Sequence, residues 1–520
     1  MTLRFTLEPP QWILGNRTAL IRPAMPLFGT AATRKIEQAA QATCPPHALM
    51  QQAGLSVARL ALALAPHAQT IWLACGPDNN GGDGLEAAMH LQQWGKTPVV
   101  TWLGHPDHTP ADAKSSWQRA AGAGVAFAQT PPEKFDFCID ALLGIGASAT
   151  PASGALPPRA IEGRMADWIA TVNAASAPVL AVDAPTGLNV DSGQASAHCV
   201  QADHTLSLVT LKPGLFTADG RDASGEIWLD TLGAASFDPP DAWLGASPLQ
   251  QQRRHASHKG SYGDVAVVGG APGMTGAALL AGSAALHAGA GRVFVTLLDD
   301  IAVAVDHLQP ELMFRRLDAL DLAALTVVCG CGGGTAMAQP LSAILVSAAH
   351  AVVDADALNA IAADRQHRAR LAARAANGQP TILTPHPLEA ARLLATTTEQ
   401  VQQNRLQAAM QLANEMGCTV VLKGSGTVIA APGQVPVINL TGNARLATAG
   451  TGDVLAGMMG ARMAELVGNR ATGGSATAAL AFRAACDAVY LHGQRADLWP
   501  ARSMLTASGL ARSLGGEATD

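Results

Sequence analysis

The residue best suited to chemistry in the second half of the chain is a carboxylate that follows a glycine-rich turn. In the stretch ATAGTGDVLAG (447–457), Asp453 comes directly after Gly450-Thr-Gly452 and opens a helical pattern. Successive N–H groups in such a turn form a nest for an anion. The carboxylate could then accept a proton from a hydroxyl group that attacks a phosphoryl group. An isolated Asp at a helix start is more often a cap, but the adjacent nest favours the catalytic role.

Three polar clusters in the first half stand where apolar runs stop, and they are CGPDNNGGDG (75–84), DALLGIG (140–146) and DAPTGLN (183–189). The carboxyl ends of parallel strands meet at one edge of a sheet, so we expect these loops to converge on one crevice. The glycines of the first cluster would let a phosphate approach the backbone at a helix N-terminus. A plain Gly/Asn turn is the alternative, and the density of polar residues favours a site.

The same clusters carry Asp140 and Asp183, together with Asn80 and the hydroxyl group of Thr186. Hard oxygen donors of this kind suit an alkali or alkaline-earth cation better than a transition metal. Each Asp could also be a turn former or a helix cap. The eight cysteines are scattered in apolar runs, and the paired histidines lack companion ligands, so we expect neither disulfides nor a zinc site.

Strands and helices of an α/β protein must position these loops. The chain has 520 residues, of which 48% are hydrophobic and 14% charged, and this length predicts two domains. Apolar runs alternate with Ala/Leu-rich helical segments, which predicts right-handed βαβ units and parallel sheets. The strand-like runs are 70–76, 97–104, 135–144 and 177–185, followed by 264–270, 292–298, 325–334, 351–358, 380–387 and 419–429.

An irregular stretch at 233–260, with paired prolines and a glutamine run, is typical of a linker. We place the boundary near residue 245, which gives domains at 1–245 and 246–520. The formal charge of -6 is spread along the chain without a basic patch, which argues against a nucleic-acid surface. No apolar run is long enough to predict a membrane span or a signal peptide. We therefore expect a cytoplasmic protein, and we also expect it to be a homo-oligomer.

Several ordered motifs in the first half are specific enough to identify a family. They are QQAG (51–54), the three clusters above, with DAPTGLN extended to VDAPTGLNVDSG (182–193), and HTLSLVTLKPGL (204–215). Together they resemble the NAD(P)H-hydrate epimerase family over roughly residues 25–232. The resemblance implies a Rossmann-like three-layer domain that interconverts the R and S forms of hydrated NADH or NADPH.

This resemblance also assigns roles to residues. It implies that Asp183 is the acid/base residue and that Asn80, Asp140 and Thr186 hold a potassium ion. Two loops are implied to contact the hydrate, namely Asn79, Asn80, Gly81, Gly82 and Asp83, and Gly144, Ile145, Gly146, Ala147, Ser148, Ala149 and Thr150. Asp78 stands where the family usually has Gly, and it adds a negative charge beside the proposed phosphate site.

The GTGD turn resembles that of the ribokinase-like superfamily, and further motifs narrow the choice within it. In order they are SHKGSYGDVAVVGG (257–270), GMTGAALLAGSAALHAGAG (273–291), DADALN (354–359), TPHPLEAARLL (384–394), VVLKGSGTVI (420–429) and GNARLATAGTGDVLAG (442–457). They resemble ADP-dependent NAD(P)H-hydrate dehydratase over essentially residues 250–515. The resemblance implies that ADP phosphorylates the hydroxyl group of the S hydrate, after which phosphate is eliminated.

The second resemblance assigns a hydrate site and a nucleotide site. Ala277, Gly332, His386 and Asp453 are implied to face the hydrate, with Asp453 as the catalytic base. The nucleotide, with Mg²⁺ on its phosphates, is implied to bind Lys423, Gly424, Ser425, Gly426, Thr427 and Gly452. Two residues depart from the pattern, since both Leu388 and Ala449 stand where the family more often has Gly.

The two halves together predict a bifunctional repair enzyme, because a dehydratase specific for one epimer would leave the other epimer unrepaired. The alternative is a ribokinase-like small-molecule kinase fused to a Rossmann-like binding module. A kinase would accumulate a phosphorylated product instead of free phosphate. The binding-module alternative is disfavoured by the presence of both Asp140 and Asp183.

Overall fold

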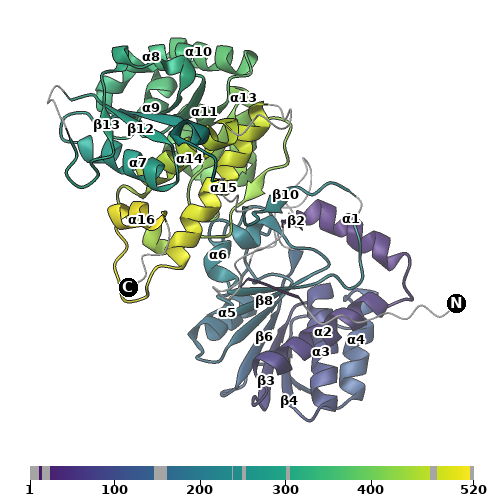
Figure 1. Cartoon of the computed structure of the whole chain (residues 1–520). Helices are drawn as coiled ribbons and strands as arrows, with labels where there is room; N and C mark the ends of the chain where they lie inside the picture. The colour runs from purple at the N-terminus through teal and green to yellow at the C-terminus, as the bar shows by residue number, and fades with distance from the viewer. Residues whose placement is uncertain are drawn as a thin grey trace. The chain divides into compact units, whose positions relative to one another are not determined.

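The computed structural model describes residues 11–14, 24–145, 161–236, 238–248, 253, 255–299, 305–468 and 477–515. The described chain divides into two compact units. The first includes 11–14 and 26–242, and the second includes 24–25 and the residues from Trp243 onward. Each unit is built around its own β-sheet with helices packed against it (Figure 1). The α/β class that the sequence predicts is therefore confirmed.

The described sheet of the first unit has the strand order β1-β9-β8-β7-β6-β3-β4-β5. Strands β3 to β9 are parallel to their neighbours, and β1 is antiparallel to β9. The bounds are β1 Gln11–Leu14, β3 Thr70–Cys75, β4 Thr97–Trp102, β5 Ala126–Ala128, β6 Phe137–Ala141, β7 Val179–Val182, β8 His204–Leu208 and β9 Glu226–Asp230. A short strand, β2 (Met25–Leu27), precedes the first helix.

Helices cover both faces of this sheet. Side chains of successive strand residues point to opposite faces, so Leu73 packs with α2 and α3 while Trp72 packs with α5. Figure 1 shows α2, α3 and α4 on one side and α5 on the other. The helices are α1 Thr30–Gln41, α2 Ala48–Leu64, α3 Asn79–Gln93, α4 Ala111–Gly122, α5 Arg164–Ala174 and α6 Gly220–Ala223. This is a three-layer arrangement whose loops at the strand ends remain available for a site.

The sheet of the second unit includes the order β13-β12-β11-β14-β15-β16-β17-β18-β19-β10. The strands from β13 to β17 are parallel, whereas β18 is antiparallel to both β17 and β19. The bounds are β10 Ala242–Leu244, β11 Asp264–Gly269, β12 Arg292–Leu297, β13 Met313–Phe314, β14 Thr326–Cys329, β15 His350–Val353, β16 Thr381–Leu383, β17 Thr419–Leu422, β18 Val428–Ala430 and β19 Val437–Ile438.

The core of the second unit lies between this sheet and its covering helices. Val265 and Val328 from the strands pack with Ala281 of α7, Met459 of α14 and Ala485 of α15. The helices are α7 Thr275–His287, α8 Ala338–Ser347, α9 Ala355–Ala363, α10 Arg365–Ala376, α11 Pro387–Leu394, α12 Thr398–Gln403, α13 Arg405–Met416, α14 Thr451–Gly468, α15 Thr477–Asp497 and α16 Ala507–Ser513. Among the described residues, none of the helices is both long and apolar enough to cross a membrane.

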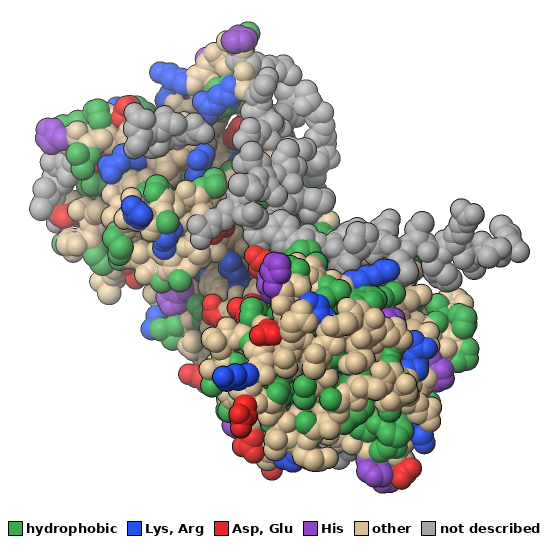
Figure 2. Space-filling view, turned by 90° about the horizontal axis from the view of Figure 1, so that it is seen from below, with side chains coloured by type: hydrophobic (Ala, Val, Ile, Leu, Met, Phe, Trp, Pro, Cys, Tyr) green, Lys and Arg blue, Asp and Glu red, His purple; other side chains and the backbone are tan. Residues whose placement is uncertain are grey.

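Two strand predictions need correction. The run 351–358 is a strand only to Val353, because the helix α9 begins at Ala355. The run 419–429 is two antiparallel strands joined by a turn in which Gly424 and Gly426 have φ values of 134° and 61°. Glycine reaches these positive φ values at little cost, which allows the tight reversal. On the face that Figure 2 shows, charged side chains of both signs are interspersed with apolar ones.

Candidate active sites

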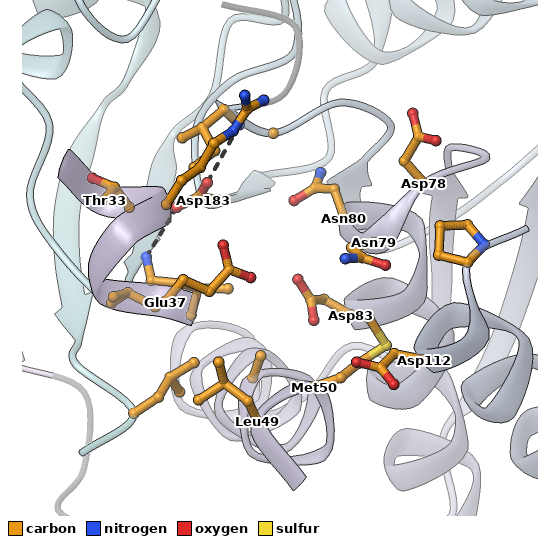
Figure 3. A pocket seen from close by; sticks show the side chains of 18 of the residues that line it. Thr33, Glu37, Leu49, Met50, Asp78, Asn79, Asn80, Asp83, Asp112 and Asp183 are labelled. Atoms are coloured by element: carbon orange, nitrogen blue, oxygen red, sulfur yellow. Dashed lines mark hydrogen bonds between the residues drawn. The ribbon is translucent and has the colours of Figure 1, made fainter. Parts of the chain in front are cut away.

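The first unit contains a cavity of about 440 Å³ at the carboxyl ends of its central strands. Its wall includes Asn79, Asn80 and Asp83 after β3, residues 142–145 after β6, and Asp183 after β7. Side chains of helices α1 and α2 also line the cavity, as does Asp112 of α4. The three loops that the sequence predicts to converge therefore do so, and Figure 3 shows Asp183 and Asp83 on different sides of the cavity.

Asp183 occupies the end of β7 in a strained backbone conformation. Its φ of 67° lies in the left-handed region, which costs a residue other than glycine about 1–3 kcal/mol. Its N–H donates to the carbonyl of Leu206 at 2.8 Å. Its carboxylate accepts hydrogen bonds from the N–H groups of Leu208 (3.2 Å) and Ile145 (3.4 Å). The surrounding structure thus fixes this carboxylate in the cavity wall.

Lys212 holds the same carboxylate from the protein interior. Its side chain is fully buried, and its Nζ forms an ion pair with Oδ1 of Asp183. The remaining donors of Nζ reach the hydroxyl of Ser207 at 3.1 Å and the carbonyl of Leu208 at 2.8 Å. A buried ammonium group is tolerated only when it is paired and hydrogen-bonded in this way. Lys212 therefore orients Asp183 and leaves its Oδ2 at the cavity.

Asp140 and Thr186 lie beneath the cavity, where both are buried. The hydroxyl of Thr186 donates to Oδ1 of Asp140 at 2.7 Å, and its N–H donates to Oδ2 at 2.8 Å. Burial raises the pKa of Asp140 to about 6, although these hydrogen bonds act in the opposite direction. Among the described residues no cationic side chain pairs with Asp140. A buried carboxylate without a counterion is suited to hold a cation.

Asn80 is the third residue predicted to hold that cation. A side chain on Gly144 would meet its Oδ1 at 3.0 Å and Oδ2 of Asp183 at 3.3 Å, so these three residues lie close together. The Nδ2 of Asn80 is buried and lacks a hydrogen-bond partner. Amide, carboxylate and hydroxyl oxygens are the donors that a hard cation prefers. The chemistry of these donor groups therefore fits a potassium ion.

Two further carboxylates belong to this cavity, and Figure 3 shows Glu37 and Asp83 directed toward one another across it. Burial, and then the charge of Asp183, raise the pKa of Asp83 well above its ordinary value. The same two causes raise the pKa of Glu37, although Lys212 and Arg34 oppose them. The cavity can therefore present protonated carboxyl groups as well as the ion-paired carboxylate of Asp183.

Not every residue predicted for this site lines the cavity. Gly81 and Gly82 are buried at the start of α3. An added Cβ on Gly81 would lie 2.0 Å from the carbonyl oxygen of Gly76, and one on Gly82 would lie 2.6 Å from Sδ of Met50. Their small size serves helix packing, and a contact of their backbone with the hydrate stays a prediction. The predicted residues Gly146, Ala147, Ser148, Ala149 and Thr150 lie outside the described residues.

Sequence reasoning missed Lys212, Glu37 and Arg34. The signal for Lys212 was a lone charged residue between the apolar run of β8 and Pro213. Glu37 and Arg34 lie on α1, which packs over the strand ends from a distant part of the sequence. Nothing in the local pattern of α1 distinguishes them from residues of an ordinary surface helix.

In the second unit, Asp453 lies in the first turn of α14, as the sequence predicts. Its carboxylate accepts a hydrogen bond from the buried thiol of Cys331. Ligand atoms of Cys331, Asp354 and Asp453 all lie within 4.8 Å of one another. Burial, and then repulsion from Asp354, raise the pKa of Asp453 to about 6. This value is suited to a general base that must exchange protons near neutral pH.

Asp354 is a site residue that the sequence does not single out, although it opens the motif DADALN. It is almost fully buried, and it accepts hydrogen bonds from Nζ of Lys423 and the hydroxyl of Thr384, both at 2.7 Å. Burial lowers the pKa of Lys423, but Asp354 and Glu389 reverse this effect and raise it overall. Lys423 therefore remains positively charged, as the binding of phosphates requires.

Several other predicted residues surround this centre. A side chain on Gly452 would lie 3.7 Å from Nζ of Lys423. An added Cβ on Gly332 would lie 2.8 Å from Cβ of Ala277. These two residues, both predicted to contact the hydrate, are therefore neighbours. His492 on α15 donates from Nε2 to the carbonyl of Thr451 at 3.0 Å, and burial lowers its pKa to about 4. A neutral histidine thus supports the GTGD turn.

His386, whose side chain is exposed, is the N-cap of α11. Its Nδ1 accepts hydrogen bonds from the N–H groups of Leu388 (3.1 Å) and Glu389 (3.4 Å), and its own N–H donates to Glu389. Burial, followed by the charge of Lys423, lowers the pKa of His386. The side chain of Leu388 is half exposed, so the loop accommodates its bulk without burying it.

The predicted nucleotide loop, 423–427, is the turn between β17 and β18. Arg405 lies beneath it, fully buried, and donates to the carbonyls of Leu422 (3.2 Å) and Lys423 (3.1 Å). A Cβ on Gly424 would approach the guanidinium group to 2.9 Å. Burial lowers the pKa of Arg405 to about 10, so it remains charged below this loop. Sequence reasoning missed Arg405 because it stands in a pattern typical of a helix.

The centre also fits a divalent cation that accompanies a nucleotide. Asp354 and Asp453 offer carboxylate oxygens side by side, which Mg²⁺ accepts together with phosphate oxygens. The third member of the group, the thiol of Cys331, is a soft donor that Mg²⁺ does not favour. The burial of Cys331 raises the pKa of its thiol, so it remains a hydrogen-bond donor to Asp453.

Both halves of the chain are similar to known proteins. A family model described as NAD(P)H-hydrate dehydratase matches residues 265–515, and one described as YjeF-related protein N-terminus matches residues 46–214. The chain is similar to the bifunctional NAD(P)H-hydrate repair enzyme Nnr of Escherichia coli, at 33% identity over 87% of this chain and 85% of that protein. The enzyme of the same name from Coxiella burnetii is 34% identical, over 84% of this chain and 90% of that protein.

Among solved structures, the second half is similar to an ADP/ATP-dependent NAD(P)H-hydrate dehydratase from Bacillus subtilis that was co-crystallised with ATP/Mg²⁺. The identity is 28% over 51% of this chain and 91% of that chain, with a TM-score of 0.40. A ribokinase-like superfamily protein from Enterococcus faecalis V583 is 25% identical over 51% of this chain and 89% of that chain, with a TM-score of 0.41.

Proposed function

Because the chain belongs to the family of bifunctional NAD(P)H-hydrate repair enzymes, we propose that its two units divide the repair of hydrated NADH and NADPH between them. The domain at 1–245 is the epimerase, which interconverts the R and S hydrates. The domain at 246–520 is the ADP-dependent dehydratase, which returns the S hydrate to NAD(P)H. The cytoplasmic location and the homo-oligomeric state stay predictions of the sequence.

In the epimerase half, we assign acid/base catalysis to Asp183. In the epimerisation we propose, the carboxyl group protonates the ring hydroxyl, the carbon–oxygen bond breaks with its electron pair, and water leaves a cation that the ring nitrogen stabilises. Water then adds to the opposite face of that carbon while the carboxylate takes a proton back, so the same group serves both directions. The buried pair with Lys212 and the two backbone donors support this role, because they fix the carboxylate at the cavity. Asn79, Asn80, Asp83, Gly144 and Ile145 then surround the hydrate.

Asp140, Thr186 and Asn80 are the residues that would hold a potassium ion. When bound, the ion supplies positive charge beneath the cavity and neutralises a buried carboxylate. The absence of any cationic partner for Asp140 among the described side chains supports this assignment. Thermal unfolding in KCl and in LiCl tests it, since K⁺ should raise the Tm of the wild type and not that of Asp140→Asn.

In the dehydratase half, Asp453 accepts the proton of the substrate hydroxyl as that oxygen receives a phosphoryl group from ADP. Lys423 and the N–H groups of the turn that contains Gly452 stabilise the transferring phosphoryl group. Asp354 and Asp453 would hold Mg²⁺, which would neutralise charge on the phosphates. The single observation that carries this half is the position of Asp453, with its pKa raised to about 6, beside the charged Lys423.

Return of NADH from its hydrate tests the proposal. Full-length protein receives a mixture of both NADH-hydrate epimers with ADP and Mg²⁺, and the recovery of NADH absorbance is followed. The wild type should restore all of the hydrate. Asp453→Asn should restore none, and Asp183→Asn combined with Lys212→Met should restore only the S fraction at the enzymatic rate. The double variant removes the Asp without leaving an unpaired buried lysine.

Two outcomes would overturn the proposal. Phosphorylated hydrate that accumulates without recovery of NADH would identify a kinase instead of a dehydratase. A double variant at 183 and 212 that still restores both epimers at the rate of the wild type would remove the epimerase assignment. Spontaneous epimerisation of the substrate, measured without protein, sets the blank rate.

A further inference from the structure

The charge of the cavity in the first unit is unusual for a site that is expected to take a dinucleotide. Its described wall contains five carboxylate side chains, from Glu37, Asp78, Asp83, Asp112 and Asp183. Arg34 is the one cationic side chain among the described residues of that wall. Lys212 already pairs with Asp183 and His47 with Asp112, so within the described wall Arg34 alone is left to face the two negative charges of a diphosphate group.

The carboxylates that face the interior of the cavity are suited to an uncharged ligand. Asp83 and Glu37 point toward one another across the cavity (Figure 3), and the burial of both raises the pKa of each above its ordinary value. A protonated carboxyl group both donates and accepts a hydrogen bond. A carboxamide, which also has one acceptor and an N–H donor, is its natural partner. The hydrated nicotinamide ring carries such a carboxamide and has no charge.

The glycines of the first glycine-rich loop are used for close packing. Gly81, Gly82 and Gly84 lie in helix α3, and a Cβ on each would meet protein atoms within 2.8 Å. Asp78 precedes this helix and also lines the cavity, where its carboxylate opposes an anion at the helix N-terminus. The density of glycines, which suggests phosphate binding in the sequence, is thus explained by packing in the fold.

We propose that the cavity recognises only the uncharged head group of the coenzyme, namely the hydrated nicotinamide ring with its carboxamide, while the phosphates lie outside it. The epimerase therefore acts on a broader class of substrate, the hydrated reduced nicotinamides that carry no phosphate, such as the hydrate of reduced nicotinamide riboside. This inference rests on the proposed epimerase function and extends its range of substrates.

The experiment compares hydrated reduced nicotinamide riboside with NADH hydrate. The full-length protein is used without ADP, so that only epimerisation proceeds, and the R and S forms are separated by chromatography. We expect the kcat/KM for the riboside hydrate to lie within about tenfold of that for NADH hydrate, because the contacts inside the cavity are shared. The variant with Asp183→Asn and Lys212→Met should lose activity on both substrates, which places both reactions in one site.

Different results would contradict the inference about the head group and the proposed epimerase function. If NADH hydrate is epimerised and the kcat/KM for the riboside hydrate is lower by about a hundredfold or more, the phosphates are recognised and the inference is wrong. If neither substrate is epimerised faster than the blank, the proposed epimerase function itself is wrong.

Arg34 supplies a second, independent measurement. Arg34 and Glu37 both lie on helix α1 and line the same cavity, so we infer that Arg34 belongs to head-group recognition. Arg34→Gln should then change kcat/KM for both substrates by the same factor. A loss confined to NADH hydrate would show that Arg34 binds phosphate and would overturn the inference. Raising the ionic strength should leave the KM for NADH hydrate unchanged or lower it, whereas a cationic phosphate site would give a higher KM.

Discussion

Asp453 and Cys331 illustrate how single side chains set the chemistry of the second unit. Burial, and then the charge of Asp354, raise the pKa of Asp453 to about 6, while the hydrogen bond from Cys331 lowers it. A base is active only in its ionised form, so the activity should be lost as the pH falls through this value. If Asp453 is the base, as we propose, Cys331 is a positioning residue that also adjusts the pH at which this base works.

The pH profile of the dehydratase follows from this pair. For the S hydrate, kcat/KM should be constant at neutral pH and decline below about pH 6 as Asp453 takes up a proton. In Cys331→Ala the inflection should move to higher pH, because a hydrogen bond that favours the carboxylate is lost. Cys331→Ser retains a hydroxyl donor and should restore the wild-type profile. An inflection that is identical in the wild type and Cys331→Ala would contradict this role.

The buried ion pair between Lys212 and Asp183 predicts a clear effect on stability. Lys212→Met should lower the free energy of unfolding of the first unit by about 3–5 kcal/mol, because Asp183 then loses its charge partner. The further change Asp183→Asn should recover much of this loss, since no unpaired charge remains. Urea unfolding measures both variants. A Lys212→Met protein that unfolds at the wild-type urea concentration would exclude a structural role for the pair.

At the scale of elements, close packing of helices positions the GTGD turn. An added Cβ on Gly457 of α14 would lie 2.1 Å from the carbonyl oxygen of Ala281 in α7. The two helices can approach this closely only because position 457 has no side chain. Gly276 in α7 differs, because an added Cβ there would have no neighbour within 4 Å. Close packing therefore does not explain Gly276.

These two glycines form a matched pair of variants. Gly457→Ala should destabilise the second unit by about 1–3 kcal/mol or more, because α14 must move away from α7. It should also lower the dehydratase rate, since Asp453 moves with α14. Gly276→Ala should stabilise the unit by up to about 1 kcal/mol, as Ala favours the helix over Gly. Thermal unfolding of both variants measures the difference, and equal Tm values would contradict the packing argument.

Most of the parallel strands can be predicted from the sequence, because each is an apolar run that ends at a polar loop. The predicted runs do not include β5, β8, β9 and β13. The site residues Asn80, Asp140 and Asp183 lie at or just beyond strand ends, so the topology of a parallel sheet brings them together. Glu37 cannot be predicted in this way, because a distant helix brings it to the cavity. The packing role of Gly81 is also hidden, since sequence alone does not reveal what a glycine approaches.

At the scale of the whole molecule, each unit has its own core. The first unit has separate clusters of buried side chains on the two faces of its sheet, with Leu73 in one and Trp72 in the other. A third cluster in the second unit joins Val265 to helices α7, α14 and α15. Units with separate cores are expected to unfold as separate cooperative transitions.

Calorimetry should therefore resolve two unfolding transitions. ADP with Mg²⁺ should raise the Tm of only one of them. At a ligand concentration of about 100 times Kd, the stabilisation of the second unit should be about 2.7 kcal/mol. Adenosine, which lacks the phosphates that Lys423 is proposed to bind, should shift neither transition appreciably. A single transition that moves as a whole with ADP would show that the two units unfold together.

The left-handed backbone of Asp183 has a consequence for the descent of this domain. A duplicated copy of the domain that is no longer needed as an enzyme would be stabilised by Gly at position 183, because Gly adopts a positive φ without strain. That substitution alone would leave the ammonium group of Lys212 buried without its partner, so both positions must change together. Inactive descendants should thus be recognisable by paired replacement at 183 and 212, long before the rest of the fold diverges.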